Sequence, residues 1–139
     1  MSHLHQASCI AIAGRALLIE GEPGSGKSSL ALALIDRGAE LIGDDAVALD
    51  LCDGKLCASP PPNIAGLLEV RNVGLLHFQT TREVPVALVL RLDGQAPRFI
   101  EKCENVDLIG MAIPLVRLWP DSPVLHLRAE AALNMYGLG

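Results

Sequence analysis

The sequence predicts an α/β fold in which a mixed sheet with flanking helices is built around a phosphate-binding loop (P-loop). Three observations predict it. The apolar run Ala16–Ile19 is followed by a glycine-rich loop and then by a strongly helix-forming segment, 28–37. Strand-like segments joined by short turns make part of the sheet antiparallel. The run Val84–Leu92 is apolar enough to be a buried strand.

The first half of the chain is expected to form strands at Cys9–Ala13, Ala16–Glu20, Glu40–Gly43, Ala46–Leu51 and Leu56–Ser59, with a helix at 27–37. Short turns at Gly14-Arg15 and Asp53-Gly54 make hairpins of the strands that flank them. Gly38 is a good end for the helix. The proline-rich segment 59–63 cannot be a central strand and separates the two halves.

The second half is expected to contain short apolar runs at Leu67–Val70 and Gly74–Phe78 around Arg71-Asn72, strands at Val84–Leu92 and Leu115–Leu118, and a helix at Val124–Met135. Residues 107–110 fit either a helical turn or part of a strand, and residues 124–127 taken alone also fit a strand. No repeat or linker interrupts the chain. With 139 residues, we expect one domain, 1–139.

Composition limits the function classes. The formal charge of −5 argues against a nucleic-acid partner, and no apolar run approaches the 18 or so residues of a membrane span. The first residues lack the organisation of a signal peptide, so we expect a cytoplasmic protein. Aromatic residues make up only 3%, so Leu, Ile, Val and Ala must build the core. The cysteines at 9, 52, 57 and 103 favour reduced structural thiols, with a metal site at Cys52 and Cys57 as the alternative.

The most informative motif fits the P-loop pattern G-x-x-x-x-G-K-[ST] and consists of Gly21, Glu22, Pro23, Gly24, Ser25, Gly26, Lys27 and Ser28. Glycines let the backbone wrap closely around an anion, and consecutive backbone N–H groups form a nest for it. Lys27 is placed to reach the β- and γ-phosphates and Ser28 to bind Mg²⁺. A chance glycine-rich turn is the alternative, but the strand before the motif and the helix after it favour nucleotide binding.

The acidic pair Asp44-Asp45 follows a predicted strand just after the P-loop helix, where the chain returns to the phosphates. One carboxylate there can hold Mg²⁺ or its waters, and the other can accept a proton from an attacking hydroxyl. The alternative is a polar turn that ends a strand. The chain has no Asn-Lys-x-Asp motif for a GTPase, and its eight scattered arginines do not suggest the lid of a nucleotide kinase.

Together, His5, the P-loop, residues 41–47 and the run Leu67–Leu76 resemble the catalytic domain of HPr kinase/phosphorylase, in its short proteobacterial form. The segment Leu68-Glu69-Val70-Arg71 and Gly74 carries the most specific part of the likeness. The resemblance implies a fold related to phosphoenolpyruvate carboxykinase. It also implies an ATP- and Mg²⁺-dependent kinase that phosphorylates a serine of HPr, a phosphocarrier protein, with reversal by phosphorolysis in many members. Homo-oligomers, usually hexamers, are the family habit.

The resemblance assigns roles to residues one at a time. His5, Lys27, Asp45 and Arg71 match catalytic positions, and Asp44 is the acid beside Asp45. Asp45 would transfer the proton, and Arg71 would stabilise charge on the transferred group. Ser28 and Glu69 match the Mg²⁺ positions. On the residues alone, His5 also fits a disordered chain end, and Glu69 and Arg71 also fit a solvated strand face.

One stretch departs from the family pattern. The late Arg-Pro-Gly-Arg-Asn motif tied to phosphorolysis should fall near residues 113–120, where only Arg117 and Pro120 match it. A further family arginine has Arg98 as its nearest counterpart. Two other functions stay open on sequence grounds. One is a nucleotide-binding regulatory module without phosphotransfer, and the other is a small-molecule P-loop kinase.

Overall fold

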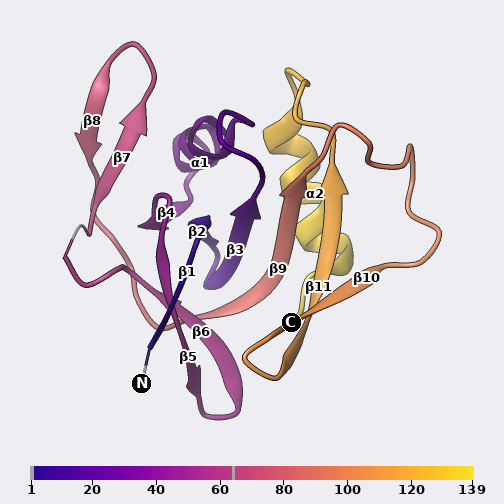
Figure 1. Ribbon diagram of the computed structural model, residues 1–139, viewed down its shortest axis with the longest axis horizontal. Helices are drawn as coiled ribbons and strands as arrows, with labels where there is room; N and C mark the ends of the chain where they lie inside the picture. The colour runs from indigo at the N-terminus through magenta and orange to yellow at the C-terminus, as the bar shows by residue number, and fades with distance from the viewer. Residues whose placement is uncertain (1, 64) are drawn as a thin grey trace.

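The computed structural model describes residues 2–63 and 65–139, and its strands form a curled mixed sheet accompanied by two helices (Figure 1). The elements, in chain order, are β1 (His3–His5), β2 (Ser8–Ile12), β3 (Arg15–Glu20), α1 (Lys27–Asp36), β4 (Glu40–Gly43), β5 (Val47–Cys52), β6 (Lys55–Ser59), β7 (Leu67–Val70), β8 (Gly74–His77), β9 (Val84–Leu92), β10 (Glu104–Leu108), β11 (Met111–Leu118) and α2 (Leu125–Tyr136).

Strand β9 joins the parts of the sheet, whose main order is β1-β5-β6-β9-β3-β2-β4. Outside this order, β11 also pairs with β9, and β10 pairs with β11. The first two residues of β9 pair with β6, and from Val86 onward it runs parallel to β3. It also runs parallel to β11 from Val89. The long strand therefore bends between two sets of neighbours, which curls the sheet (Figure 1). Strands β7 and β8 form a separate hairpin.

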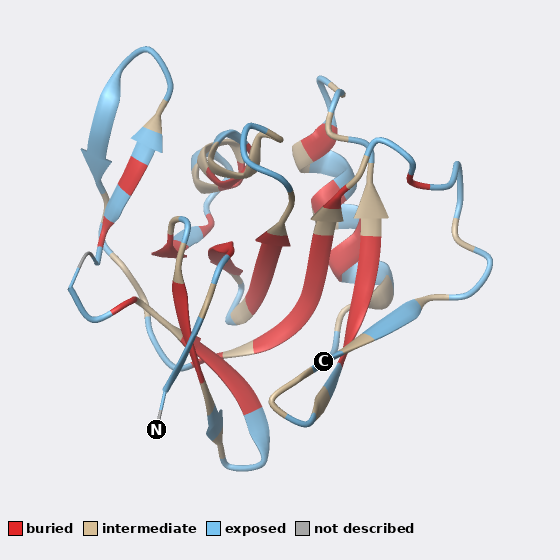
Figure 2. Cartoon of the chain, in the orientation of Figure 1, coloured by how far each residue is buried: buried red, intermediate tan, exposed pale blue. Residues whose placement is uncertain are grey.

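Alternation along β3 divides the core into two layers. Leu17 and Ile19 pack with both helices on one face, whereas Ala16 and Leu18 pack with β5 and β6 on the other. This is the two-residue period of a strand that is buried on both faces. Buried residues accordingly follow the central strands in Figure 2. The four aromatic side chains are half-buried or exposed, so the core is aliphatic, as the composition predicts.

The predicted mixed α/β architecture is confirmed, and Glu40–Gly43 and Val84–Leu92 have the predicted bounds. Helices α1 and α2 lie within a residue of their predictions at each end. The predicted position of one turn was wrong. Arg15 begins β3 rather than sitting in the turn, which falls on Ala13 and Gly14. Of the two alternatives for residues 107–110, the strand is confirmed for Asp107 and Leu108, which end β10, and residues 109–110 form a turn.

The sequence did not predict β1, most of β10 or the first half of β11, and prolines explain part of this. Pro114 lies inside β11, but it is tolerated because the pairing with β9 begins only at Leu115. Pro85 enters β9 one residue before the pairing with β3 begins. Strand β1 has three residues and a single neighbour, β5, so local pattern alone does not reveal it.

None of the helices in the described part of the chain is long and apolar enough to cross a membrane. The four cysteines are free thiols. Burial raises the pKa of Cys9, and burial together with a hydrogen bond to Cys52 raises the pKa of Cys57 to about 11.

A substitution at Gly43, the residue directly before Asp44, tests how closely the backbone packs at the acidic pair. Gly43 is buried at the end of β4, and a Cβ placed there would overlap the carbonyl oxygen of Ala46. We expect Gly43→Ala to lower the free energy of unfolding by about 1–3 kcal/mol, because backbone must move to admit the methyl group. Urea denaturation measures this. Gly94→Ala is the control, since a Cβ there meets open space, and an equal loss in both variants would contradict the prediction.

Candidate active site

The P-loop joins the end of β3 to the start of α1 in a conformation that only glycine adopts readily. Gly24 and Gly26 have φ values of 80° and 103°, and the amide of Ser25 donates to the carbonyl of Glu22 at 3.0 Å. Helix α1 begins at Lys27, and its first turn has no side-chain cap. Its N-terminal N–H groups are therefore available to an anion, and the helix dipole favours negative charge there.

Two P-loop side chains are set for a ligand that they do not contact in the protein alone. The Nζ of Lys27 donates to the carbonyls of Gly21 (2.8 Å) and Glu22 (3.1 Å), so the ammonium lies folded over the loop. The hydroxyl of Ser25 is buried and has no hydrogen-bond partner among the described residues. A buried hydroxyl without a partner is costly, and a phosphate oxygen in the loop would supply one.

Asp44 is held by donors from three elements. Its Oδ1 accepts hydrogen bonds from Ser28 of α1 at 2.7 Å and from Ser8 of β2 at 2.9 Å. Its Oδ2 accepts from the backbone N–H of Glu69 in β7 at 3.0 Å. Ser8 is fully buried in an otherwise apolar layer. Asp44 therefore fixes the Ser28 hydroxyl and ties the P-loop helix to the β7–β8 hairpin.

Asp45 lies beside Asp44 but in a different environment. It is exposed, and its φ of 66° is in the left-handed region. Asp and Asn tolerate this region better than other non-glycine residues, and such conformations concentrate at functional sites. The left-handed turn points the two successive carboxylates to different surroundings, so Asp44 binds protein donors while Asp45 faces open space.

The β7–β8 hairpin brings the segment 68–71, which includes Glu69 and Arg71, to the P-loop. Asn72, with φ of 69°, makes the turn, and the amide of Val73 donates to the carbonyl of Val70 at 3.0 Å. A Cβ at Gly24 would lie 4.0 Å from Nη2 of Arg71, so the guanidinium reaches the loop. This placement favours a functional role for Arg71 over a simple solvated face.

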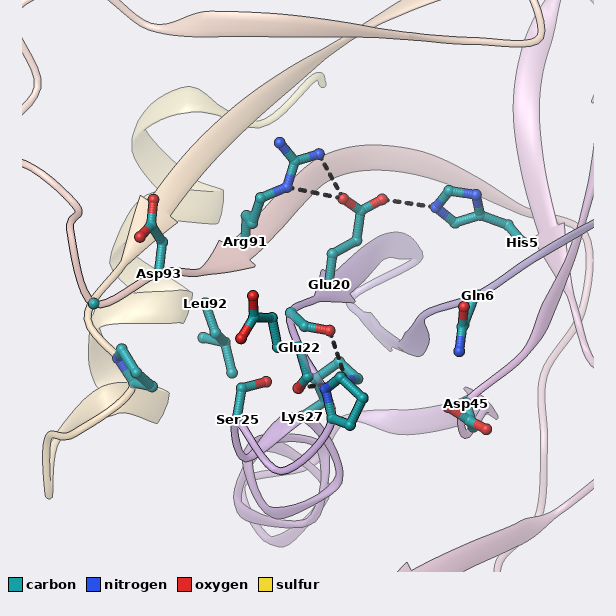
Figure 3. Close-up of a pocket in the computed structure, with 14 residues that line it drawn as sticks. His5, Gln6, Glu20, Glu22, Ser25, Lys27, Asp45, Arg91, Leu92 and Asp93 are labelled. Carbon is teal, nitrogen blue, oxygen red and sulfur yellow. Dashed lines mark hydrogen bonds and ion pairs between the residues drawn. The ribbon is translucent and has the colours of Figure 1, made fainter.

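His5 stands in β1, and a charged cluster at the ends of β3 and β9 holds its side chain (Figure 3). Its Nε2 lies 2.7 Å from Oε2 of Glu20, and Oε1 of Glu20 accepts from Nη2 (2.7 Å) and Nε (3.2 Å) of Arg91. Burial by itself raises the pKa of Glu20, but the hydrogen bonds from His5 and Arg91 and the positive charge of Arg91, joined by that of His5 when its ring is protonated, outweigh it. The pKa of Glu20 is therefore lower than its usual value.

Two cavities open on the two sides of the P-loop. One, of about 860 Å³, is lined by His5, Glu20 and Arg91; the other, of about 320 Å³, by Ser28, Asp44, Glu69 and Arg71. Lys27 and Asp45 line both. Figure 3 shows the larger cavity with Asp45 on one side and Leu92 and Asp93 on the other.

All the predicted site residues therefore gather around one loop. Arg98 and Arg117 do not join them, since they line a separate cavity, and Arg117 pairs with Glu104 (2.9 Å) and Asp93 (3.3 Å). Sequence reasoning missed Ser8, Glu20 and Arg91. A signal was present for each, because each is a polar or charged residue within or at the end of an apolar strand.

The oxygen ligands suit Mg²⁺. The hydroxyl of Ser28 and the carboxylates of Asp44 and Glu69 line the smaller cavity, and hard oxygen donors are what Mg²⁺ prefers. Within residues 2–63 and 65–139, no group of three or more His, Cys, Asp or Glu side chains could hold a metal ion by itself.

Comparison with known proteins gives consistent matches. Residues 1–84 match the family model described as the HPr Serine kinase C-terminal domain. The chain is 37% identical to an HPr kinase/phosphorylase of Cupriavidus necator over 123 residues, which cover 77% of this chain and 37% of the relative. The corresponding protein of Burkholderia lata is 35% identical over 125 residues, covering 78% and 38%. The chain thus spans little more than a third of the length of these relatives.

The match to a solved structure extends over nearly the whole chain. The Hpr(Ser) kinase/phosphatase from Coxiella burnetii superposes with a TM-score of 0.84 at 26% identity, covering 95% of this chain and 88% of the other. The second half of the chain, which the family model does not cover, therefore shares the fold as well.

The charged cluster predicts a pH-dependent contribution to stability. Because the folded-state pKa of Glu20 is lower than its usual 4.5, the contacts of its ionised carboxylate with Arg91 and His5 stabilise the fold above that pH. The contribution is lost as pH falls through the lower folded value. We expect Glu20→Gln to be less stable than the parent at pH 7, and the difference to shrink in acid. Urea midpoints measured between pH 7 and pH 3 test this, with the exposed Glu40→Gln as control. A difference that grows in acid would contradict it.

Proposed function

The chain belongs to the HPr serine kinase family, and from this membership and the geometry of the site we propose that it is an ATP- and Mg²⁺-dependent protein serine kinase domain acting on HPr. The observation that carries the proposal is that Lys27 and Asp45 line both cavities at the P-loop. A phosphate held by the loop would lie between a cation that stabilises it and a carboxylate free to accept a proton.

On this proposal the P-loop binds the nucleotide phosphates. The backbone N–H groups at the start of α1 and the unpartnered Ser25 hydroxyl donate to phosphate oxygens. Lys27 leaves the carbonyls of Gly21 and Glu22 for the β- and γ-phosphates, an exchange that replaces neutral acceptors with charged ones.

Ser28 and Glu69 would hold Mg²⁺, and Asp44 orients Ser28 through their 2.7 Å hydrogen bond. When bound, the ion neutralises phosphate charge and aligns the γ-phosphate for transfer.

The exposed Asp45 is the proposed base. It accepts the seryl proton as the serine oxygen bonds to the γ-phosphorus and the bond to the β–γ bridging oxygen breaks, releasing ADP. Lys27 and Arg71 lie on the P-loop side and stabilise charge on the transferred group. His5 lines the larger cavity with Asp45, where it can contact the acceptor segment.

Several wider features belong to the same proposal. We propose that residues 1–139 form one kinase catalytic domain, that the protein works in the cytoplasm, where HPr would be met, and that it assembles as a homo-oligomer, a hexamer by family resemblance. Light scattering of the purified protein tests the last of these.

One experiment tests the central proposal. The purified protein is incubated with Mg²⁺, γ-labelled ATP and HPr, and the labelled residue is identified. Label on a serine of HPr supports the kinase. Nucleotide binding without label transfer supports a regulatory module, and label transfer to small molecules but not to HPr supports a small-molecule kinase.

Lys27→Ala tests the P-loop assignment. Loss of a charged contact that strengthens in the transition state should slow phosphotransfer by on the order of a hundredfold or more, about 3 kcal/mol. Thermal unfolding should change little, because the Lys27 side chain contacts loop carbonyls rather than the core. Phosphotransfer near the parent rate would rule the assignment out.

Asp45→Asn tests the proposed base. Asparagine keeps the size of the side chain and tolerates the left-handed backbone, so the loop should hold its shape. Phosphotransfer should fall by roughly 10²–10⁴-fold while ATP binding persists. Asp44→Asn is the comparison, and if it loses chemistry while Asp45→Asn stays active, the roles of the two acids are reversed.

The direction of catalysis is a further expectation. Phosphorolysis needs inorganic phosphate held in line with phosphoserine, which calls for convergent donors. In the stretch 113–120, Arg117 is bound by Glu104 and Asp93, and Pro120 has no N–H. We expect phosphoserine-HPr to be dephosphorylated much more slowly than HPr is phosphorylated. Pyrophosphate release with millimolar phosphate measures this, and comparable rates would show that other residues replace the motif.

A further inference from the structure

We propose that Glu20 is a positioning residue for His5. It holds the imidazole at the larger of the two cavities beside the P-loop, as the Nε2–H tautomer, and Arg91 holds Glu20 in place. This inference rests on the proposed function for its catalytic consequence. The geometry that supports it does not depend on that function, because His5, Glu20 and Arg91 contact each other in the protein alone.

The need for an anchor comes from the place of His5 in the fold. Strand β1 has three residues and, among the described strands, pairs only with β5 at one end of the strand order. A short strand that is paired on one side only opens more readily than a central strand. The 2.7 Å contact with Glu20 fastens the last residue of β1 to the residue that directly precedes the P-loop.

Glu20 can serve as an anchor because it is itself rigidly held. It ends β3, which pairs with β2 on one side and with β9 on the other. Glu20 and Arg91 are register partners across β3 and β9, and the guanidinium donates two hydrogen bonds to Oε1. Oε2 is left for His5, so each carboxylate oxygen has its own partner (Figure 3).

The chemistry of the three groups determines which ring nitrogen carries the proton. Arg91 has only donors, and an ionised carboxylate has only acceptors. The Nε2 of His5 must therefore be the donor to Oε2. In the neutral ring this leaves the proton on Nε2 and the lone pair on Nδ1. A fixed tautomer and ring position matter for a side chain that must meet an acceptor group within hydrogen-bond reach.

Glu20→Gln reverses this arrangement with little change of shape. The amide oxygen turns to Arg91, because the guanidinium can only donate. The amide NH₂ then faces His5, and because it can only donate, the Nε2 of His5 must accept. The substitution is thus expected to move the ring proton from Nε2 to Nδ1.

Nitrogen NMR of the ¹⁵N-histidine-labelled protein reads the tautomer directly, with His5 assigned by its absence in His5→Gln. We expect a protonated Nε2 in the neutral ring of the parent and a shift toward a protonated Nδ1 in Glu20→Gln. Glu130→Gln is the matched control, since it removes a 2.9 Å pair between α2 and Arg37, the residue that follows α1, away from both P-loop cavities. It should leave the His5 signals unchanged.

Kinase assays with HPr test the consequence. Glu20→Gln should lower kcat by about tenfold to a hundredfold with the KM for ATP nearly unchanged, because a misplaced group costs chemistry rather than nucleotide binding. Added to His5→Gln, the same substitution should have almost no further effect, since Glu20 acts through His5. Glu130→Gln should keep the parent kcat.

Three results would overturn the proposal: a protonated Nδ1 and unprotonated Nε2 in the neutral ring of the parent, unchanged His5 signals in a folded Glu20→Gln, or equal losses of kcat with and without His5. The first needs no variant, so it applies even if Glu20→Gln fails to fold. If the parent protein shows the expected tautomer but transfers no phosphate to HPr, the proposed function fails while the positioning of His5 stands.

Discussion

The Asp44 carboxylate accepts hydrogen bonds from Ser28, from Ser8 and from the backbone of Glu69. These donors belong to α1, β2 and β7, so one side chain joins the P-loop helix, the sheet and the separate hairpin. A carboxylate in this position needs its donors, because an unsatisfied charge away from water is costly. The arrangement of the smaller cavity depends on this contact, since it sets the Ser28 hydroxyl and brings Glu69 and Arg71 to the loop.

Adjacent acids in the sequence thereby come to occupy different environments. The carboxylate oxygens of Asp44 accept hydrogen bonds from protein donors, whereas Asp45, with its left-handed backbone, is exposed and lines both cavities together with Lys27. Two carboxylates with distinct surroundings can take distinct roles, one structural and one chemical. A similar division holds at the other cavity, where Arg91 and Glu20 compensate each other's charge and His5 is the member of the cluster that lies on the edge strand.

Local patterns predicted much of the fold. The run Val84–Leu92 is a strand with the predicted bounds because, apart from Arg91 near its end, it is apolar as a buried strand requires. Helix α1 lies close to its prediction because a P-loop motif specifies where its helix begins. Strand β1 was not predicted, because three residues carry no period and its stability comes from pairing with β5, more than forty residues away. Strand β10 has no apolar run, and among the described strands it pairs with β11 alone.

For the site, the sequence by itself determined the P-loop, the acidic pair and the Leu68–Arg71 segment, because their chemistry depends on neighbouring residues in the chain. Only the tertiary structure decided which acid holds Ser28, which side chain holds His5, and that Arg117 is engaged by carboxylates. Glu20 and Arg91 become partners through the register of two parallel strands, and a single sequence does not specify register across seventy-one residues. Motifs are local, whereas the contacts that orient their side chains come from strand pairing and burial.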